Sequence, residues 1–134
     1  MIGDRLGRTL ALAALVAVGG FAGATLRYLV AIPVPGLAGT LLANAAGSTA
    51  LGALFYESVY AGGLSREARL AAGSGFLSSF TTYSTFVLQS ATAPGPLLTV
   101  ANVVATYGFG FAGVLVGRVV AGLLTGARAG GDPP

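Results

Sequence analysis

Four long apolar runs follow one another along the chain, and short segments rich in glycine, proline or charge separate them. A run of about 20 apolar residues is the length that an α-helix needs to cross the hydrocarbon core of a bilayer. We therefore predict transmembrane helices over residues 9–29, 37–56, 70–90 and 97–117. Prolines at 33, 35, 94 and 96 mark two of the turns, because proline lacks a backbone donor and fixes φ. The pattern predicts an all-α membrane protein, with one four-helix unit over residues 1–118 and a flexible tail over 119–134.

The first apolar run has one other interpretation, a cleavable secretory signal. Arg5 and Arg8 precede the run, and Ala22-Gly23-Ala24 resembles the small-residue site at which signal peptides are cut. The run is longer than the apolar part of a usual signal peptide, and three further runs follow it. We therefore favour a transmembrane helix here.

Composition supports membrane insertion and narrows the possible chemistry. Hydrophobic residues make up 54% of the 134 residues and charged residues 8%, whereas a typical soluble domain is about 25% charged. The chain has no cysteine and no histidine, so it lacks disulfides, thiolate and imidazole ligands, and the commonest general base. Its seven basic residues are scattered rather than clustered, which argues against nucleic-acid binding. We do not expect an enzyme.

A dense polar cluster lies in the third predicted helix, within a stretch from Leu70 to Gly117 that holds no charged residue. The segment 78–86 carries six aliphatic hydroxyls and one phenol. An unpaired hydroxyl in hydrocarbon costs roughly 4 to 8 kcal/mol, so the cluster must satisfy itself or face something polar. In an ordinary helix each hydroxyl would bond the carbonyl four residues earlier. We favour a break in the helix, since unwound backbone at membrane depth is tolerated where it lines a polar path.

The polar side chains inside the predicted helices suit a small, strongly hydrated anion. Each of them donates hydrogen bonds, and no carboxylate lies mid-span. Tyr83 and Phe86, three residues apart, add ring edges that carry the positive part of the aromatic quadrupole. Carbonyls exposed at the same break have the opposite preference and suit a desolvated monovalent cation. Asn44 and Arg27 have plainer alternatives, an interhelical hydrogen bond for the amide and extension to the membrane interface for the guanidinium.

Three motifs, in order along the chain, carry a resemblance to a known family. They are Gly19-Gly20-Phe21-Ala22-Gly23-Ala24-Thr25-Leu26-Arg27-Tyr28, Gly39-Thr40-Leu41-Leu42-Ala43-Asn44-Ala45-Ala46-Gly47-Ser48, and Gly75-Phe76 continuing through Phe86. Together they resemble the successive signatures of the CrcB/Fluc fluoride channels. The fourth predicted helix offers Asn102 and Thr106 where that family has polar residues along its ion path. The resemblance covers essentially the whole chain except the tail.

The resemblance implies an antiparallel dimer of four-helix subunits with two fluoride pores, passive fluoride export, and a central structural sodium ion (Na+). Backbone carbonyls of Ser78 and Thr81 would hold the sodium ion. The pathway would combine a pore amide, an aromatic pair and a polar track, formed by Asn44, Tyr83, Phe86, Thr82, Ser84, Thr85, Asn102 and Thr106, with Arg27 in the aqueous vestibule.

The chain departs from the pattern of this family at three places. It has Ser78-Ser79 where the family commonly has two glycines, Tyr83 where the family has Phe, and Gln89 where the family has Glu. Carbonyl ligation needs no particular side chain, although residues other than glycine narrow the backbone angles available at the break. The Tyr83 hydroxyl adds one more donor. We expect a conducting pore with altered affinity.

Basic residues are distributed unevenly between the two ends of the predicted bundle. With four spans, the end that holds both termini collects Arg5, Arg8, Arg66, Arg69, Arg118 and Arg128, and the other end has Arg27 alone. The positive-inside rule then predicts a cell-membrane protein with both termini cytoplasmic. An antiparallel pair of identical chains needs copies inserted both ways. We therefore predict pairing with a homologous subunit of opposite charge bias, with a homodimer as the alternative.

Two other functions fit the size and hydropathy of the chain. A small multidrug-type transporter has a similar number of helices, but its proton coupling needs an intramembrane carboxylate, and the four acidic residues lie outside the predicted spans. A non-conducting membrane scaffold would explain small residues recurring at helical spacing, but it leaves the hydroxyl cluster unexplained. The fluoride channel is the interpretation we favour.

Overall fold

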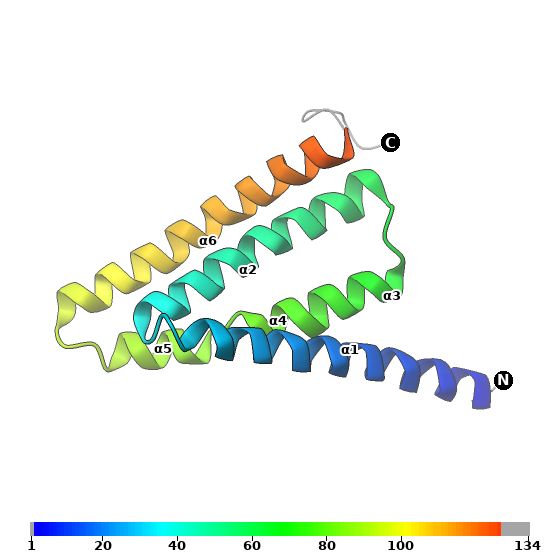
Figure 1. Ribbon diagram of the computed structural model, residues 1–134, viewed down its shortest axis with the longest axis horizontal. Helices are drawn as coiled ribbons and strands as arrows, with labels where there is room; N and C mark the ends of the chain where they lie inside the picture. The colour runs from blue at the N-terminus through cyan, green and yellow to red at the C-terminus, as the bar shows by residue number, and fades with distance from the viewer. Residues whose placement is uncertain (1, 127–134) are drawn as a thin grey trace.

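The computed structural model describes residues 2–126, which form helices joined by short turns (Figure 1). In chain order the elements are α1 (Ile2–Ala31), α2 (Leu37–Tyr56), the π-helix η1 (Glu57–Ala61), α3 (Arg66–Arg69), the π-helix η2 (Leu70–Leu77), α4 (Ser78–Phe80), α5 (Ser84–Ala91) and α6 (Pro96–Thr125). No strand occurs within this part of the chain. The prediction of an all-α membrane protein is confirmed at this level.

Within residues 2–126, three helices are long and apolar enough to cross a membrane, Gly3–Ala31, Leu37–Ala61 and Pro96–Thr125. The third predicted helix, residues 70–90, is divided instead into η2, α4 and α5, and the short helix α3 precedes it. The interruption falls at residues 81–83. At Thr81 the backbone is extended, with φ −78° and ψ 160°, and helical hydrogen bonding cannot continue through that conformation.

Two helices extend beyond the apolar runs that predicted them. α1 begins at Ile2 and includes Asp4 in its first turn, where a carboxylate interacts favourably with the helix dipole. α6 continues through the exposed Arg118 to Thr125, so the prediction of a flexible tail is wrong for residues 119–125. A surface arginine does not stop a helix, whereas Gly126, with φ 66°, adopts the left-handed conformation that ends one. The rest of the predicted tail, residues 127–134, lies outside the described residues.

Glycines lie where the helices cross most closely. α6 packs along α2, and a Cβ on Gly117 would collide with the carbonyl oxygen of Thr49. α1 packs on η2, and a Cβ on Gly23 would collide with the carbonyl oxygen of Phe76. Small residues at such crossings let backbones approach closely, which is typical of membrane helices that associate by packing rather than by burial of apolar surface from water.

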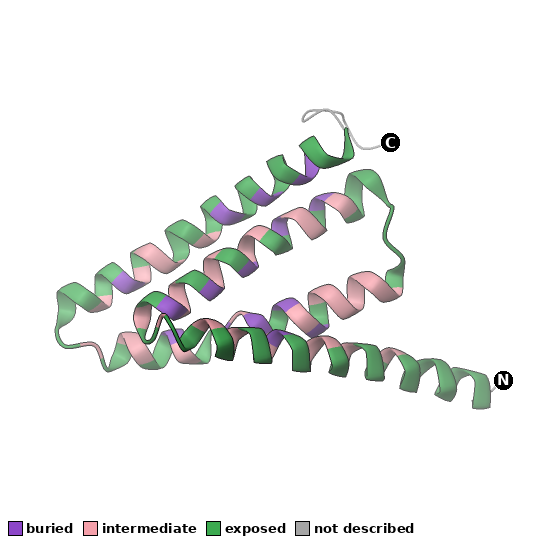
Figure 2. Ribbon diagram, viewed as in Figure 1, coloured by how far each residue is buried: buried purple, intermediate pink, exposed green. Residues whose placement is uncertain are grey.

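The ends of the helices gather in two groups. The start of α1, the connection between α2 and α3, and the end of α6 lie at one end of the molecule, and the α1–α2 and α5–α6 connections lie at the other (Figure 1). Exposed residues cover much of α1 and α6 (Figure 2). Large apolar side chains, among them Phe21, Leu97 and Leu123, are exposed. Apolar exposure on this scale fits a surface that meets lipid or a further subunit.

Candidate functional site

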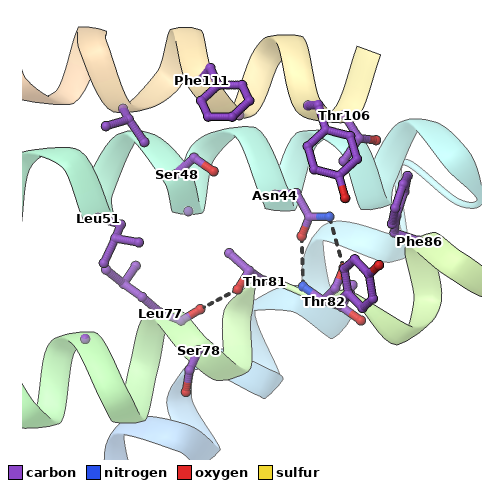
Figure 3. Close-up of a pocket in the computed structure, with 16 residues that line it drawn as sticks. Asn44, Ser48, Leu51, Leu77, Ser78, Thr81, Thr82, Phe86, Thr106 and Phe111 are labelled. Atoms are coloured by element: carbon purple, nitrogen blue, oxygen red, sulfur yellow. Dashed lines mark hydrogen bonds between the residues drawn. The ribbon is translucent and has the colours of Figure 1, made fainter. Parts of the chain in front are cut away.

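Asn44, on α2, holds the backbone of the interrupted third segment. Its Nδ2 donates a hydrogen bond to the Thr82 carbonyl oxygen at 3.0 Å, and its Oδ1 accepts one from the Thr82 N–H at 2.8 Å (Figure 3). The interhelical hydrogen bond that was the plainer alternative for Asn44 is therefore present. A side-chain amide bonded twice in this way satisfies backbone groups that the break deprives of helical partners.

Thr82 restarts the helix on the far side of the break. Its side chain is buried, at 8% exposure. The Oγ1 atom accepts a hydrogen bond from the Thr85 N–H at 3.2 Å and donates to the Thr85 Oγ1 at 3.0 Å. A threonine oxygen that accepts from the N–H three residues later satisfies a donor that has no partner within the first turn of a helix. The Thr82 side chain thus bonds the first turn of α5 while Asn44 holds the Thr82 backbone.

The hydroxyls on the other side of the break bond within their own helix. The Ser78 hydroxyl donates to the Ser74 carbonyl, and the Thr81 hydroxyl donates to the Leu77 carbonyl at 2.9 Å. Back-bonding, which we treated as an alternative to a break, therefore occurs together with the break. It uses the hydroxyl protons of Ser78 and Thr81, so these two residues offer a ligand oxygen lone pairs, including those of their carbonyls, rather than donors.

Those carbonyl oxygens have lost their helical donors. In a continuous α-helix the Thr82 N–H would bond the Ser78 carbonyl and the Thr85 N–H would bond the Thr81 carbonyl. In the structure the first N–H bonds Asn44 and the second bonds the Thr82 side chain. Unwound carbonyls of this kind suit a monovalent cation. Within residues 2–126 no group of three or more His, Cys, Asp or Glu side chains is placed to hold a metal ion.

A cleft of ≈ 590 Å³, which we call the central cleft, lies between α2, α6 and the interrupted segment (Figure 3). Its lining includes seven residues predicted for the site, namely Asn44, Ser78, Thr81, Thr82, Tyr83, Phe86 and Thr106. The remaining wall is largely glycine and apolar, formed by Gly47, Ser48, Leu51, Gly73, Leu77, Tyr107, Gly110, Phe111 and Val114. The Asn44 amide and the Thr106 hydroxyl thus bring hydrogen-bond donors to a largely apolar cleft whose lining includes no carboxylate.

Three aromatic rings meet along the central cleft. The centroids of Tyr83 and Phe86 are 5.8 Å apart with the rings tilted by 49°. Tyr107, from α6, approaches Phe86 at 5.9 Å with the rings at 89°, an edge-to-face contact. Phe86 is buried at 5% exposure and Tyr83 is open at 69%. Sequence patterns do not single out Tyr107, because its contact with Phe86 depends on how α5 lies against α6.

Thr106 places an unpaired hydroxyl on the wall of the central cleft. Its Oγ1 is buried and has no hydrogen-bond partner in the part of the chain that the structure describes. Other threonines on α6 behave differently, since the hydroxyl of Thr125 donates to the Ala121 carbonyl at 2.9 Å. The Thr106 hydroxyl is therefore available to donate a hydrogen bond to a ligand in the central cleft.

A second cleft of ≈ 300 Å³, the side cleft, lies beside the turn between α1 and α2. Arg27, Thr85 and Gln89 line it, together with Ala24, Tyr28, Ala31, Gly36, Gly39, Thr40 and Thr82. The Oε1 atom of Gln89 is buried without a hydrogen-bond partner among the described residues. Thr82 lines both clefts and therefore stands between them.

Two residues predicted for the site line neither cleft. Ser84 is exposed, and its hydroxyl lies 3.5 Å from that of Thr82. Asn102 is buried at 8% exposure and donates to the Ser90 Oγ at 2.9 Å. Ser90 in turn donates to the Phe86 carbonyl at 2.8 Å. Asn102 thus links α6 to α5 through Ser90.

Known proteins resemble this chain over most of its length. The family described as "CrcB-like protein, Camphor Resistance (CrcB)" matches residues 14–118. A protein of Haloarcula marismortui named "Fluoride-specific ion channel FluC 1" is 56% identical over 112 residues, 84% of this chain and 87% of the relative. One of Halobacterium salinarum named "Fluoride-specific ion channel FluC 2" is 56% identical over 116 residues, 86% of this chain and 90% of the relative. The three motifs and these matches agree, and the chain belongs to the CrcB family.

Proposed function

We propose that this chain is a subunit of a fluoride-specific channel that lets fluoride leave the cell passively. The central observation is the convergence of donors and aromatic edges in the central cleft without a carboxylate, in a chain 56% identical to relatives named fluoride-specific ion channels. A buried, unpaired hydroxyl at Thr106 destabilises a protein unless a ligand uses it. A passing anion that accepts hydrogen bonds is such a ligand.

In this proposal the side cleft is the vestibule. The guanidinium of Arg27 attracts an anion from water, and Gln89, being neutral, does not repel it. Thr85 follows as a hydroxyl donor that replaces part of the hydration shell, and the Thr82 hydroxyl donates to the Thr85 Oγ1. Because Thr82 also lines the central cleft, the two clefts meet at its side chain.

The central cleft would carry the anion past an amide, a hydroxyl and two rings. Asn44 uses one of its two amide N–H groups on Thr82, and the other is free to donate. Thr106 adds its unpaired hydroxyl, and Tyr83 and Phe86 present ring edges. Several weak contacts in sequence let an ion enter and also leave, which conduction requires.

The channel would be an antiparallel dimer in which each subunit crosses the membrane four times. The interrupted segment over residues 66–91 makes the remaining crossing beside the three long helices. Tyr83 lines the central cleft but is 69% exposed in the single chain, so a second subunit that covers it would close that side of the cleft. We further propose that the second subunit is a homologue inserted the opposite way, and that both termini of this chain are cytoplasmic.

The carbonyls of Ser78 and Thr81 would hold a structural sodium ion that is not transported. Neither carbonyl receives its helical N–H, so both oxygens are free to coordinate a cation. Bound there, sodium would supply a fixed positive charge close to the anion pathway.

Fluoride efflux from proteoliposomes tests the proposed function. Vesicles loaded with potassium fluoride and made permeable to potassium by valinomycin should release fluoride when the chain is reconstituted with its homologous partner. Vesicles without protein, and vesicles loaded with chloride, are the controls. Equal efflux of chloride and fluoride, or no fluoride efflux with the partner present, would contradict the proposal. Efflux of a cationic dye driven by a pH gradient would favour the multidrug-type alternative instead.

A further inference from the structure

We propose that Asn44 and Thr82 are positioning residues for the sodium site, so that the same two side chains serve the anion pathway and build the cation site. The inference deepens the proposed function and rests on it. It follows from where two backbone N–H groups donate. In each case a side chain of the central cleft takes a donor away from a carbonyl that would face the cation.

Asn44 frees the Ser78 carbonyl. The Thr82 N–H, which a continuous helix would direct to Ser78, donates to the Asn44 Oδ1 at 2.8 Å. The orientation of the amide is fixed by its second bond, because the Thr82 carbonyl only accepts and the Asn44 Nδ2 only donates, at 3.0 Å. Asn44 belongs to α2, so the cation site depends on the packing of α2 against the interrupted segment.

Thr82 frees the Thr81 carbonyl in the same manner. The Thr85 N–H, which would otherwise return to Thr81, donates to the Thr82 Oγ1 at 3.2 Å. The extended ψ of 160° at Thr81 also turns its carbonyl out of the helical direction. The two side chains therefore act on the two carbonyls predicted for sodium, one each.

The arrangement links the two ions. An anion that accepts a hydrogen bond from the Asn44 amide or the Thr82 hydroxyl acts on the same side chains whose oxygens keep the carbonyls free, and hydrogen bonds in such a chain polarise one another. Equilibrium coupling of this kind is reciprocal, so sodium must change the affinity for the anion by the same factor.

Sodium-dependent stability tests the inference without reference to transport. The reconstituted dimer is heated in lipid nanodiscs across a series of sodium concentrations, with N-methylglucamine as the replacing cation and no fluoride. Asn44→Leu removes the acceptor, so the sodium concentration for half-maximal stabilisation should rise about tenfold, the effect of one hydrogen bond. Asn44→Asp keeps an acceptor for the Thr82 N–H but loses the donor to the Thr82 carbonyl and adds a charge, so the variant that keeps an acceptor without these changes is Thr82→Ser.

A second pair of variants covers the case in which Asn44→Leu does not fold. Thr82→Val removes the Oγ1 acceptor and should raise the sodium midpoint, whereas Thr82→Ser keeps it and should not. Ser90→Ala is the matched control, because it removes two hydrogen bonds on α5 away from the break. It should lower the unfolding temperature and leave the sodium midpoint unchanged.

Hydrogen exchange supplies the readout that a general loss of stability would not move. Sodium should slow exchange across residues 78–85 in the wild type and in Thr82→Ser, and not in Thr82→Val. A wild-type sodium midpoint in folded Thr82→Val, or an equal shift in Ser90→Ala, would overturn the inference. Fluoride efflux without any sodium response would overturn it and leave the proposed function standing. A sodium response that depends on Asn44, without fluoride efflux, would support the inference and contradict the proposed function.

Discussion

Thr106 is the residue at which stability and transport are most clearly opposed. Its buried hydroxyl has no partner among residues 2–126, and replacing it with the isosteric methyl group of valine removes that penalty. We expect Thr106→Val to raise the free energy of unfolding by about 1 kcal/mol. The same change removes a donor from the central cleft, so fluoride efflux should fall about tenfold. Denaturant unfolding and the efflux assay measure the two effects on one preparation.

Thr125→Val is the control on the same helix. Its hydroxyl already bonds the Ala121 carbonyl and lies outside both clefts, so efflux should match the wild type. If Thr106→Val also conducted normally, its hydroxyl would have no part in the pathway.

At the residue scale, the sequence indicated which side chains matter but not what each of them touches. Asn44 and the hydroxyls of 78–86 stood out because polar groups at membrane depth are costly. The bonds between Asn44 and Thr82 join residues 38 positions apart, and no spacing rule predicts such a pair. Asn102 was assigned to the pathway by resemblance, yet it donates to Ser90.

The helices themselves depend on close crossings, and Gly117 tests this directly. A Cβ there would collide with the backbone of Thr49 on α2, which cannot yield as a flexible side chain would. We expect Gly117→Ala to lower the free energy of unfolding by about 1 to 3 kcal/mol. Gly108→Ala, on the same helix with open space around its Cβ position, should leave it unchanged or raise it by up to about 1 kcal/mol, because alanine favours the helix more than glycine does. An equal loss in Gly108→Ala would mean that the close crossing at Gly117 is not what the substitution disturbs.

Helices and turns whose causes lie in nearby residues were predictable, and features that depend on packing between distant segments were not. Apolar length and proline placed the long helices and the turns, and α2 has the predicted bounds 37–56. The break was predictable because six aliphatic hydroxyls lie within residues 78–85, little more than two helical turns. The π-helical form of η2 was not predictable from the apolar pattern. Nor was its close packing on α1, where a Cβ on Gly75 would meet the Val16 carbonyl oxygen at 2.7 Å. The end of α6 was missed because Arg118 was taken as a boundary when the glycine at 126 supplies it.

At the scale of the whole molecule, the chain is a multi-pass membrane protein with strongly unequal ends. The end that gathers the start of α1, the α2–α3 connection and the end of α6 carries five described arginines, Arg5, Arg8, Arg66, Arg69 and Arg118 (Figure 1). Arg8 approaches Glu67 at 4.0 Å and Arg69 approaches Glu57 at 3.9 Å. These pairs do not cancel the bias, because acidic residues contribute little to topology.

Orientation therefore decides whether this chain can pair with itself. We expect a reporter fused to the C-terminus to show one orientation only, with both termini cytoplasmic, and the chain expressed alone to give little fluoride efflux. Replacing Arg5, Arg8 and Arg66 with glutamine weakens the bias, so the variant should insert both ways and conduct without a partner. Paired cytoplasmic and extracytoplasmic reporters measure the orientation, and proteoliposomes measure the efflux. Strong efflux from the unmodified chain alone would mean that it already inserts in both directions and forms the antiparallel dimer from identical copies.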